Sequence, residues 1–259
     1  MNNTFPPIFA IARMTFSEVL RNKVMYSVLL FLMIILLTAT SLASVTMGRT
    51  EMMVLDIGLG SISILSSLMA IVLTIQSIQQ EKEGRMLYVL LTRISSRWQY
   101  IVGKFIGLAT IIGGLTTLMC LLLMLLASLV GTPFWPSVIQ ACIATVLETW
   151  LIIAIAMIFA QASSLFLAIL LSLSIDVAGR FTFTIQQFGQ QSDSPYLHWI
   201  TEIIYYLLPN LEAVNLRNAA GYIETYNQET MMNIFLYSFG EIGFLLIICM
   251  LVFERRDLH

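Results

Sequence analysis

The sequence predicts an all-α membrane protein that crosses the bilayer six times, and three observations lead to this prediction. Hydrophobic residues make up 58% of its 259 residues, while charged residues make up only 11%. The apolar residues gather into runs of about 20, the length that a helix needs to cross the hydrocarbon core. The charged residues gather between these runs, which is typical of a chain that passes repeatedly between water and lipid.

The first part of the chain predicts a helix on the membrane surface, followed by a first span. Pro6 and Pro7 suit the start of a helix, and residues 7–22 place apolar side chains on one side and basic side chains on another. The apolar run 24–45 follows as the first span. A disordered N-terminal tail is the alternative for the residues before that span.

Five further spans are expected along the chain. They are residues 57–78, 100–130, 138–159, 165–178 and 231–253. The third is long for a single span, so we expect it to tilt or to extend into the cytoplasm. The least hydrophobic region, residues 180–230, contains an amphipathic helix that Pro209 ends, with Trp199 and neighbouring tyrosines as interfacial anchors.

The long charged stretch of the chain, residues 79–99, separates the second and third spans. Apolar side chains recur at helical spacing over residues 83–95, which predicts an amphipathic helix that offers a docking face to a soluble partner. Ser96 and Gln99 form a capping-box pattern, so the next helix is expected to start at Arg97. A solvated cytoplasmic loop is the alternative.

The distribution of Lys and Arg predicts the orientation of the chain. If the N-terminus is cytoplasmic, three basic residues lie outside: Arg49, Arg180 and Arg217. The other ten lie on the cytoplasmic side: Arg13, Arg21, Lys23, Lys82, Arg85, Arg93, Arg97, Lys104, Arg255 and Arg256. Because basic residues favour cytoplasmic loops, both termini and residues 79–99 are predicted to be cytoplasmic, and residues 180–230 extracytoplasmic.

Three carboxylates in the spans are candidates for a functional role. Glu148 lies inside the fourth span and Glu241 inside the sixth, where a charge costs about 2.5–3.5 kcal/mol on insertion scales. Glu148 either lines a substrate path or hydrogen-bonds across helices, and both possibilities stay open. Glu241 has glycines close on either side, which favours a structural role. Asp176 and Arg180 have the i, i+4 spacing of an ion pair.

Small residues form a stripe along the third span. Gly103, Gly107 and Gly114 belong to it, and they predict close packing against another helix. A lining of the translocation path is the alternative for this stripe.

The sequence gives no support to several other classes of protein. Its three cysteines lie far apart and it has two histidines, so neither a disulfide framework nor a metal site is expected. It contains no GxxxxGK[ST] motif and no catalytic triad or HExxH motif, so direct ATP binding and enzymatic activity are not expected. Its few basic residues lie at the membrane face, so no nucleic-acid partner is expected.

Three patches of the sequence carry a resemblance to a known family. They are TFSEVLRNKVMY at 15–26, EKEGRMLYVLLTRISSRWQYIVGKFIG at 81–107 and LLPNLEAVNLR at 207–217. Together they resemble the type-2 permeases of ATP-binding-cassette (ABC) transporters, in particular the branch for multicopper-enzyme and nitrous oxide reductase maturation. The resemblance implies a homodimer of six-span subunits in a bacterial inner membrane, coupled to two ATPase subunits that bind ATP and magnesium.

The resemblance also implies a mechanism, in which ATP-driven closure of the ATPase moves the spans through residues 81–97. The implied coupling residues, whose exposed charges would contact the ATPase, are Glu81, Glu83, Arg85, Tyr88, Arg93 and Arg97. Neither the motifs nor the composition indicates a substrate. One alternative is a mechanical transmitter that drives a periplasmic partner docked on residues 180–230. The other is an ion-coupled secondary transporter that uses Glu148 and Glu241.

Overall fold

A computed structural model of the chain describes its helices and the short links between most of them. The described residues are 5–20, 26, 29–30, 33–34, 36–37, 41, 50–83, 97–130, 136–191, 195–220 and 225–254. They are almost entirely helical, which confirms the predicted all-α class. Four of the described helices are long and apolar enough to cross a membrane, or five if the bent pair α7–α8 counts as one span. Most of the predicted first span, 24–45, lies outside the described residues.

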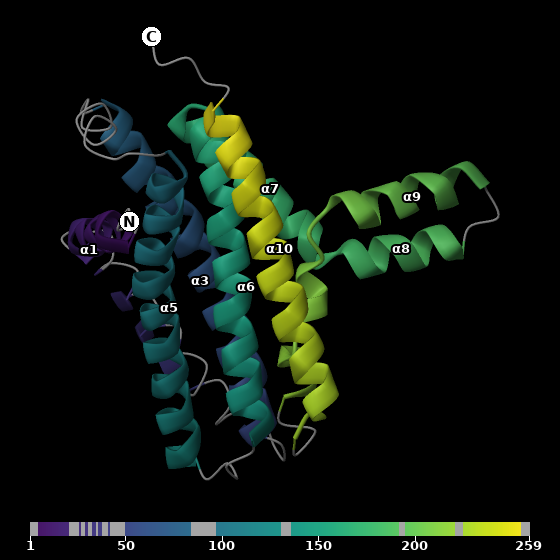
Figure 1. The fold of residues 1–259 in the computed structure, drawn as a ribbon. Coiled ribbons are helices and arrows are strands. Elements are labelled where there is room, and N and C mark those ends of the chain that lie inside the picture. Colours follow the sequence, from purple (N-terminus) through teal and green to yellow (C-terminus); the bar gives the residue numbers. More distant parts are fainter. Residues whose placement is uncertain are drawn as a thin grey trace.

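The four long helices lie side by side and form the bundle seen in Figure 1. They are α3 (Thr50–Glu83), α5 (Arg97–Val130), α6 (Pro136–Ala162) and α10 (Gln228–Glu254). The apolar runs expected to form the second, third, fourth and sixth spans lie inside these four helices. Pro136 is the first residue of α6, where its missing N–H disrupts no helical bond. The described part of α5 begins at Arg97, and the expected capping residue Ser96 lies outside the described residues.

The N-terminal helix α1 (Phe5–Leu20) packs against the upper half of α5 in Figure 1. A glycine makes this contact possible. A Cβ atom on Gly107 would lie 2.8 Å from the carbonyl oxygen of Ala12 and 2.9 Å from the Cβ of Thr15. Gly103 is also buried, whereas Gly114 is exposed and has no atom within 4 Å of a built Cβ. Within the described chain, Gly114 therefore lacks the packing partner that the sequence analysis expects.

The chain leaves the bundle after α7 (Leu165–Arg180). This helix has 16 residues and is about 24 Å long, shorter than the hydrocarbon core of about 30 Å. At Phe181 the chain bends by 53° into α8 (Thr182–Gln190). The helices α8 and α9 (Pro195–Leu207) pack against each other and project sideways from the bundle (Figure 1).

Two short 3-10 helices bring the chain back to the bundle before α10 begins. They are η1 (Leu211–Val214) and η2 (Arg217–Ala219). Asn210 caps η1, because its side-chain oxygen accepts a hydrogen bond from the backbone N–H of Ala213 at 3.1 Å. This return path carries Arg217 into the bundle, where it contacts α6.

Candidate functional site

The carboxylate of Glu148 lies at the centre of a buried polar cluster inside the bundle. Glu148 is the thirteenth of the 27 residues of α6, about 18 Å from the start of that helix. Its side chain is 2% exposed. Arg180 Nη1 lies 2.8 Å from one carboxylate oxygen and Arg217 Nη2 lies 3.4 Å from the other. The hydroxyl of Ser63, on α3, also donates to this carboxylate at 3.3 Å.

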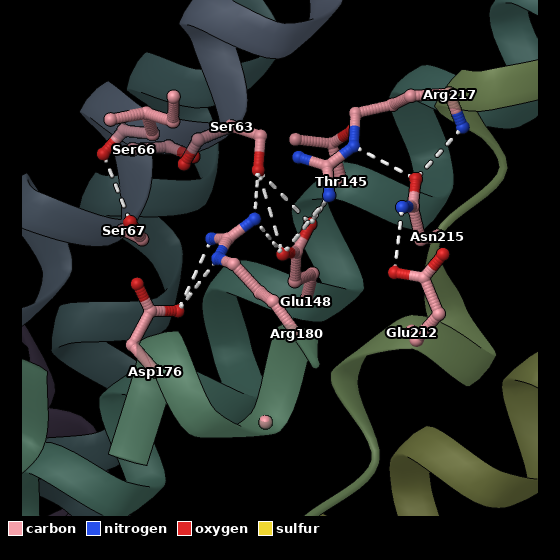
Figure 2. Close-up of polar contacts among 12 residues, drawn as sticks. Ser63, Ser66, Ser67, Thr145, Glu148, Asp176, Arg180, Glu212, Asn215 and Arg217 are labelled. Atoms are coloured by element: carbon pink, nitrogen blue, oxygen red, sulfur yellow. Dashed lines mark hydrogen bonds and ion pairs between the residues drawn. The ribbon is translucent and has the colours of Figure 1, made fainter. Parts of the chain in front are cut away.

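A second shell of polar groups holds the two guanidinium groups, as Figure 2 shows. Arg180 forms the predicted i, i+4 ion pair with Asp176, at 3.2 Å, and donates to Ser63 Oγ at 2.9 Å. Arg217 Nε donates to the side-chain oxygen of Asn215 at 3.0 Å. The amide of Asn215 in turn donates to Glu212 at 3.0 Å. The cluster therefore joins α3, α6, α7 and the segment of η1 and η2.

Charge balance explains why these groups tolerate burial. Glu148 and Asp176 carry two negative charges, and the partly exposed Arg180 and Arg217 carry two positive charges, so the four groups together are formally neutral. Burial lowers the pKa of the Arg217 guanidinium, while the neighbouring Glu148 carboxylate acts in the opposite direction. Removing any one member would leave an uncompensated charge in a site that is largely closed to water.

The two arginines also line a cavity of about 530 Å³ at the side of this cluster. The lining residues are Asp56, Gly60, Ile64, Arg180, Glu212, Asn215, Arg217 and Asn218. Asp56, Gly60 and Ile64 follow one another at a spacing of four, so they share one face of α3. The cavity is an open one, bounded by that face, by the end of α7 and by the η1–η2 segment.

A separate ionic cluster lies near one end of the bundle, beside the last turn of α3 and the first turns of α5. Lys104 is fully buried, and its Nζ atom lies 2.6 Å from Glu81 and 3.5 Å from Glu18. The Tyr100 hydroxyl donates to Glu81 at 2.5 Å, and the Ser77 hydroxyl donates to Glu18 at 3.2 Å. One lysine thus joins α1, α3 and α5.

The structure changes the expected role of Glu81. This side chain is only 5% exposed, and both of its carboxylate oxygens are bonded inside the chain. In this structure its carboxylate is therefore not one of the exposed charges that the resemblance implies. Glu83 ends α3 and Arg97 begins α5, while Arg85, Tyr88 and Arg93 lie outside the described residues.

The other predicted site residues fall into two groups. Glu148, Asp176 and Arg180 come together in the buried cluster. Glu241 is half-buried on α10, and among the described residues no polar contact joins it to that cluster. The described residues contain no group of three or more His, Cys, Asp or Glu side chains placed to hold a metal ion.

Several members of the two clusters are not among the site residues predicted from the sequence. In the first cluster these are Ser63, Glu212, Asn215 and Arg217, and in the second they are Glu18, Tyr100 and Lys104. A signal exists for Ser63, because the run SISILSS places several hydroxyls inside an otherwise apolar span. Glu212, Asn215 and Arg217 lie in the patch LLPNLEAVNLR that carries the family resemblance, but neither the resemblance nor the spacing assigns them a role, and Arg217 lies in the region predicted to be extracytoplasmic.

The family to which this sequence is similar is one of transporters, which agrees with the long apolar helices of the chain. The sequence matches the family described as ABC-2 family transporter protein over residues 9–258, which is nearly the whole chain. No curated protein matches the chain closely. Because the family match covers far more than half of the sequence, the chain belongs to the ABC-2 transporter family.

Proposed function

We propose that the chain is the permease subunit of an ATP-driven exporter in a bacterial inner membrane, with both termini in the cytoplasm. Members of the ABC-2 family are multi-pass membrane subunits that work with a separate ABC ATPase, and the family match supports that part directly. Four parts of the proposal go beyond the family match: export, the orientation in the membrane, a homodimer and membership of the maturation branch. These rest on the charge distribution and on the resemblance of residues 81–107.

The observation that carries the coupling mechanism is the buried Lys104 cluster. Residues 84–96 connect α3 to α5, so any force on that connection acts first on the ends of these two helices. Glu81 lies in the last turn of α3, and Lys104 lies two turns into α5. Their ion pair of 2.6 Å ties the two ends together, and Glu18 adds α1 to the same unit.

A second set of contacts links the end of α3 to α6. The Gln79 amide donates to the carbonyl oxygens of Ala160, at 3.2 Å, and Ser163, at 2.8 Å. The Lys82 ammonium also donates to the Ala160 carbonyl. These donors satisfy carbonyl groups at the C-terminal end of α6, where a helix carries partial negative charge. Since α6 also carries Glu148, movement of α3 has a direct mechanical route to the buried cluster.

This route assigns two different roles to the charged residues around the connection. The residues proposed to contact the ATPase are Glu83, Arg85, Tyr88, Arg93 and Arg97. Glu81 is proposed to position the helix ends through Lys104 and Tyr100, because its carboxylate is engaged inside the chain. The contact residues are expected to set the affinity of the chain for the ATPase. The positioning residues are expected to set how efficiently ATP hydrolysis is coupled to movement of the helices.

The experiment is a paired measurement on the full chain, co-expressed with an ABC ATPase subunit that co-purifies with the wild-type chain. Arg93→Ala and Glu83→Ala are expected to weaken co-purification of the ATPase. Glu81→Gln is expected to leave co-purification intact and to lower substrate-stimulated ATP hydrolysis. Glu229→Gln is the control, since this exposed carboxylate begins α10 at the far end of the bundle (Figure 1). Unchanged co-purification and hydrolysis in all three variants would refute the coupling role of this segment.

The sideways hairpin supports one alternative function. The helices α8 and α9 expose large apolar side chains, among them Phe183, Phe188, Tyr196 and Trp199. A mechanical transmitter would need such a surface for an extracytoplasmic partner. Capture of one defined periplasmic protein by the wild-type chain, and its loss in a Phe188→Ser variant, would favour the transmitter over the exporter.

A further inference from the structure

The hydroxyl of Ser63, on α3, lies between the two members of the shortest ion pair in the Glu148 cluster (Figure 2). It accepts a hydrogen bond from Arg180 Nη1 at 2.9 Å and donates one to Glu148 Oε2 at 3.3 Å. The same guanidinium nitrogen lies 2.8 Å from Glu148 Oε1. One hydroxyl can make both bonds at once, since it has one proton and two lone pairs. Ser63 is buried, so this three-way contact is closed to bulk water.

The proton of Ser63 is used differently from those of neighbouring hydroxyls. A hydroxyl inside a helix commonly donates to the carbonyl three or four residues earlier. Ser66 and Ser67 do so within α3, and Thr149 does so within α6. Ser63 instead donates across to α6, and it accepts from α7. Its contacts therefore depend on where α3 lies relative to these two helices, and not only on the fold of α3 itself.

The helix α3 joins Ser63 to the helix end on which the proposed coupling acts. Ser63 and Glu81 are 18 positions apart, which is about five helical turns and about 27 Å, so both project from the same face of α3. The residues between them include neither proline nor glycine, which are common causes of a kink. A displacement of α3 at Glu81 is therefore expected to move Ser63 with it.

Arg180 has a second carboxylate within reach. Its Nη2 atom lies 3.2 Å from Asp176, on the same helix α7. The 3.3 Å between Ser63 and Glu148 is already long for a hydrogen bond, so a shift of α3 by about 1 Å would break it. Arg180 can then turn toward Asp176 without leaving its charge buried and unpaired.

We propose that Ser63 is the positioning residue through which movement of α3 changes the pair formed by Glu148 and Arg180. When α3 moves, the hydroxyl separates from both groups, and Arg180 shifts toward Asp176. Because Arg180 also lines the open cavity, this exchange moves one wall of the cavity. The inference rests on the proposed function, since the ATPase supplies the movement.

The test places one reporter before Ser63 on this route and one after it. Gly60→Cys lies on α3, where a built Cβ has no atom within 4 Å, and Asn218→Cys lies on η2, at an exposed position of the cavity lining. The full chain is purified together with an ABC ATPase subunit that co-purifies with it. The rate of labelling by a water-soluble maleimide is measured without nucleotide and with ATP and vanadate. The three native cysteines are buried and are expected to add little labelling, and nucleotide is expected to change the rate at both reporters.

Three substitutions are then made in each reporter chain. Ser63→Ala removes the hydroxyl but leaves Glu148 with both guanidiniums, so the chain is expected to fold. It is expected to keep the nucleotide effect at Gly60→Cys and to lose the effect at Asn218→Cys. Ser63→Thr keeps a hydroxyl and is expected to retain both effects. Ser67→Ala is the matched control, because it removes a similarly buried hydroxyl that bonds to a carbonyl of α3 itself.

The outcomes separate this inference from the proposed function. A nucleotide effect at Asn218→Cys that survives in Ser63→Ala would overturn the role of Ser63 and leave the proposed function standing. Loss of that effect in Ser67→Ala as well would also overturn it, because any buried hydroxyl of α3 would then suffice. No nucleotide effect at either reporter without a further substitution would refute coupling through α3, and the role of Ser63 with it. Loss in Ser63→Ala alone, with co-purification of the ATPase unchanged, establishes the role.

Discussion

Replacing Lys104 by methionine removes the ammonium group that joins three helices and keeps nearly the same side-chain volume. The substitution leaves Glu81, which is 5% exposed, as a buried carboxylate without its cation. Breaking a buried ion pair by removing one partner typically costs about 3–5 kcal/mol, because the remaining charge is uncompensated. The Tyr100 hydroxyl still donates to Glu81, so we expect the lower part of that range.

The measurement is the unfolding temperature of the purified full chain in one fixed detergent. A loss of 1 kcal/mol lowers this temperature by about 2–4 °C for a chain of comparable size, so Lys104→Met is expected to lower it by roughly 10 °C. The double variant Lys104→Met/Glu81→Gln removes both charges and keeps an acceptor for the Tyr100 hydroxyl. It is expected to regain most of the stability, since a neutral pair leaves no buried charge uncompensated.

The double variant also separates stability from coupling. If the ion pair positions the ends of α3 and α5, substrate-stimulated ATP hydrolysis is expected to stay low in the double variant although its unfolding temperature recovers. A single variant as stable as the wild-type chain would show that Lys104 is hydrated in the membrane. A double variant as unstable as the single one would show that packing, not charge, is lost. Either result would refute the reasoning about this cluster.

The remaining predictions concern the helix packing, the buried cluster and the hairpin. Gly107→Leu is expected to destabilise the chain by about 1–3 kcal/mol, because the new side chain would push α1 away from α5. Gly114→Leu, which has room for its side chain, is expected to leave stability unchanged. Thermal unfolding measures both. Glu148→Leu leaves the guanidiniums of Arg180 and Arg217 without their shared carboxylate and is expected to lower the abundance extracted by detergent. Glu148→Gln keeps an acceptor for the Ser63 hydroxyl, so it is expected to preserve abundance and to alter transport. Equal abundance of the two variants would contradict this reasoning. If the exposed side of the α8–α9 hairpin lies in lipid, a membrane-impermeant maleimide added outside intact membranes is expected to label Glu229→Cys and to leave Phe188→Cys unlabelled. Equal labelling of the two variants would place the hairpin in water.

The long helices could be predicted from the sequence because their signal is local. A run of about 20 apolar residues satisfies its backbone only as a helix in lipid, whatever surrounds it. The expected runs 57–78, 100–130, 138–159 and 231–253 accordingly fall inside α3, α5, α6 and α10.

The partners of the buried charges could not be predicted in this way, because they are set by tertiary contacts. The insertion cost identifies Glu148 as unusual but does not say which cation neutralises it. Arg180 and Arg217 are 32 and 69 positions away, and the charge distribution places both outside the membrane. Their contact with Glu148 depends on the short length of α7 and on the bend after it, which returns the chain to the middle of α6.

The two ionic clusters share a physical property that bears on how such a chain can work. In each one, a single buried side chain, Lys104 or Glu148, bonds to groups from several helices that are far apart in sequence. Apolar packing between helices in lipid is largely non-directional and can slide, whereas a desolvated ion pair loses several kcal/mol if its partners separate. Helices tied by such pairs therefore move together or exchange one defined set of partners for another. That behaviour suits the coupling proposed above, in which a force applied at residues 84–96 has to reach the Glu148 cluster in the middle of α6.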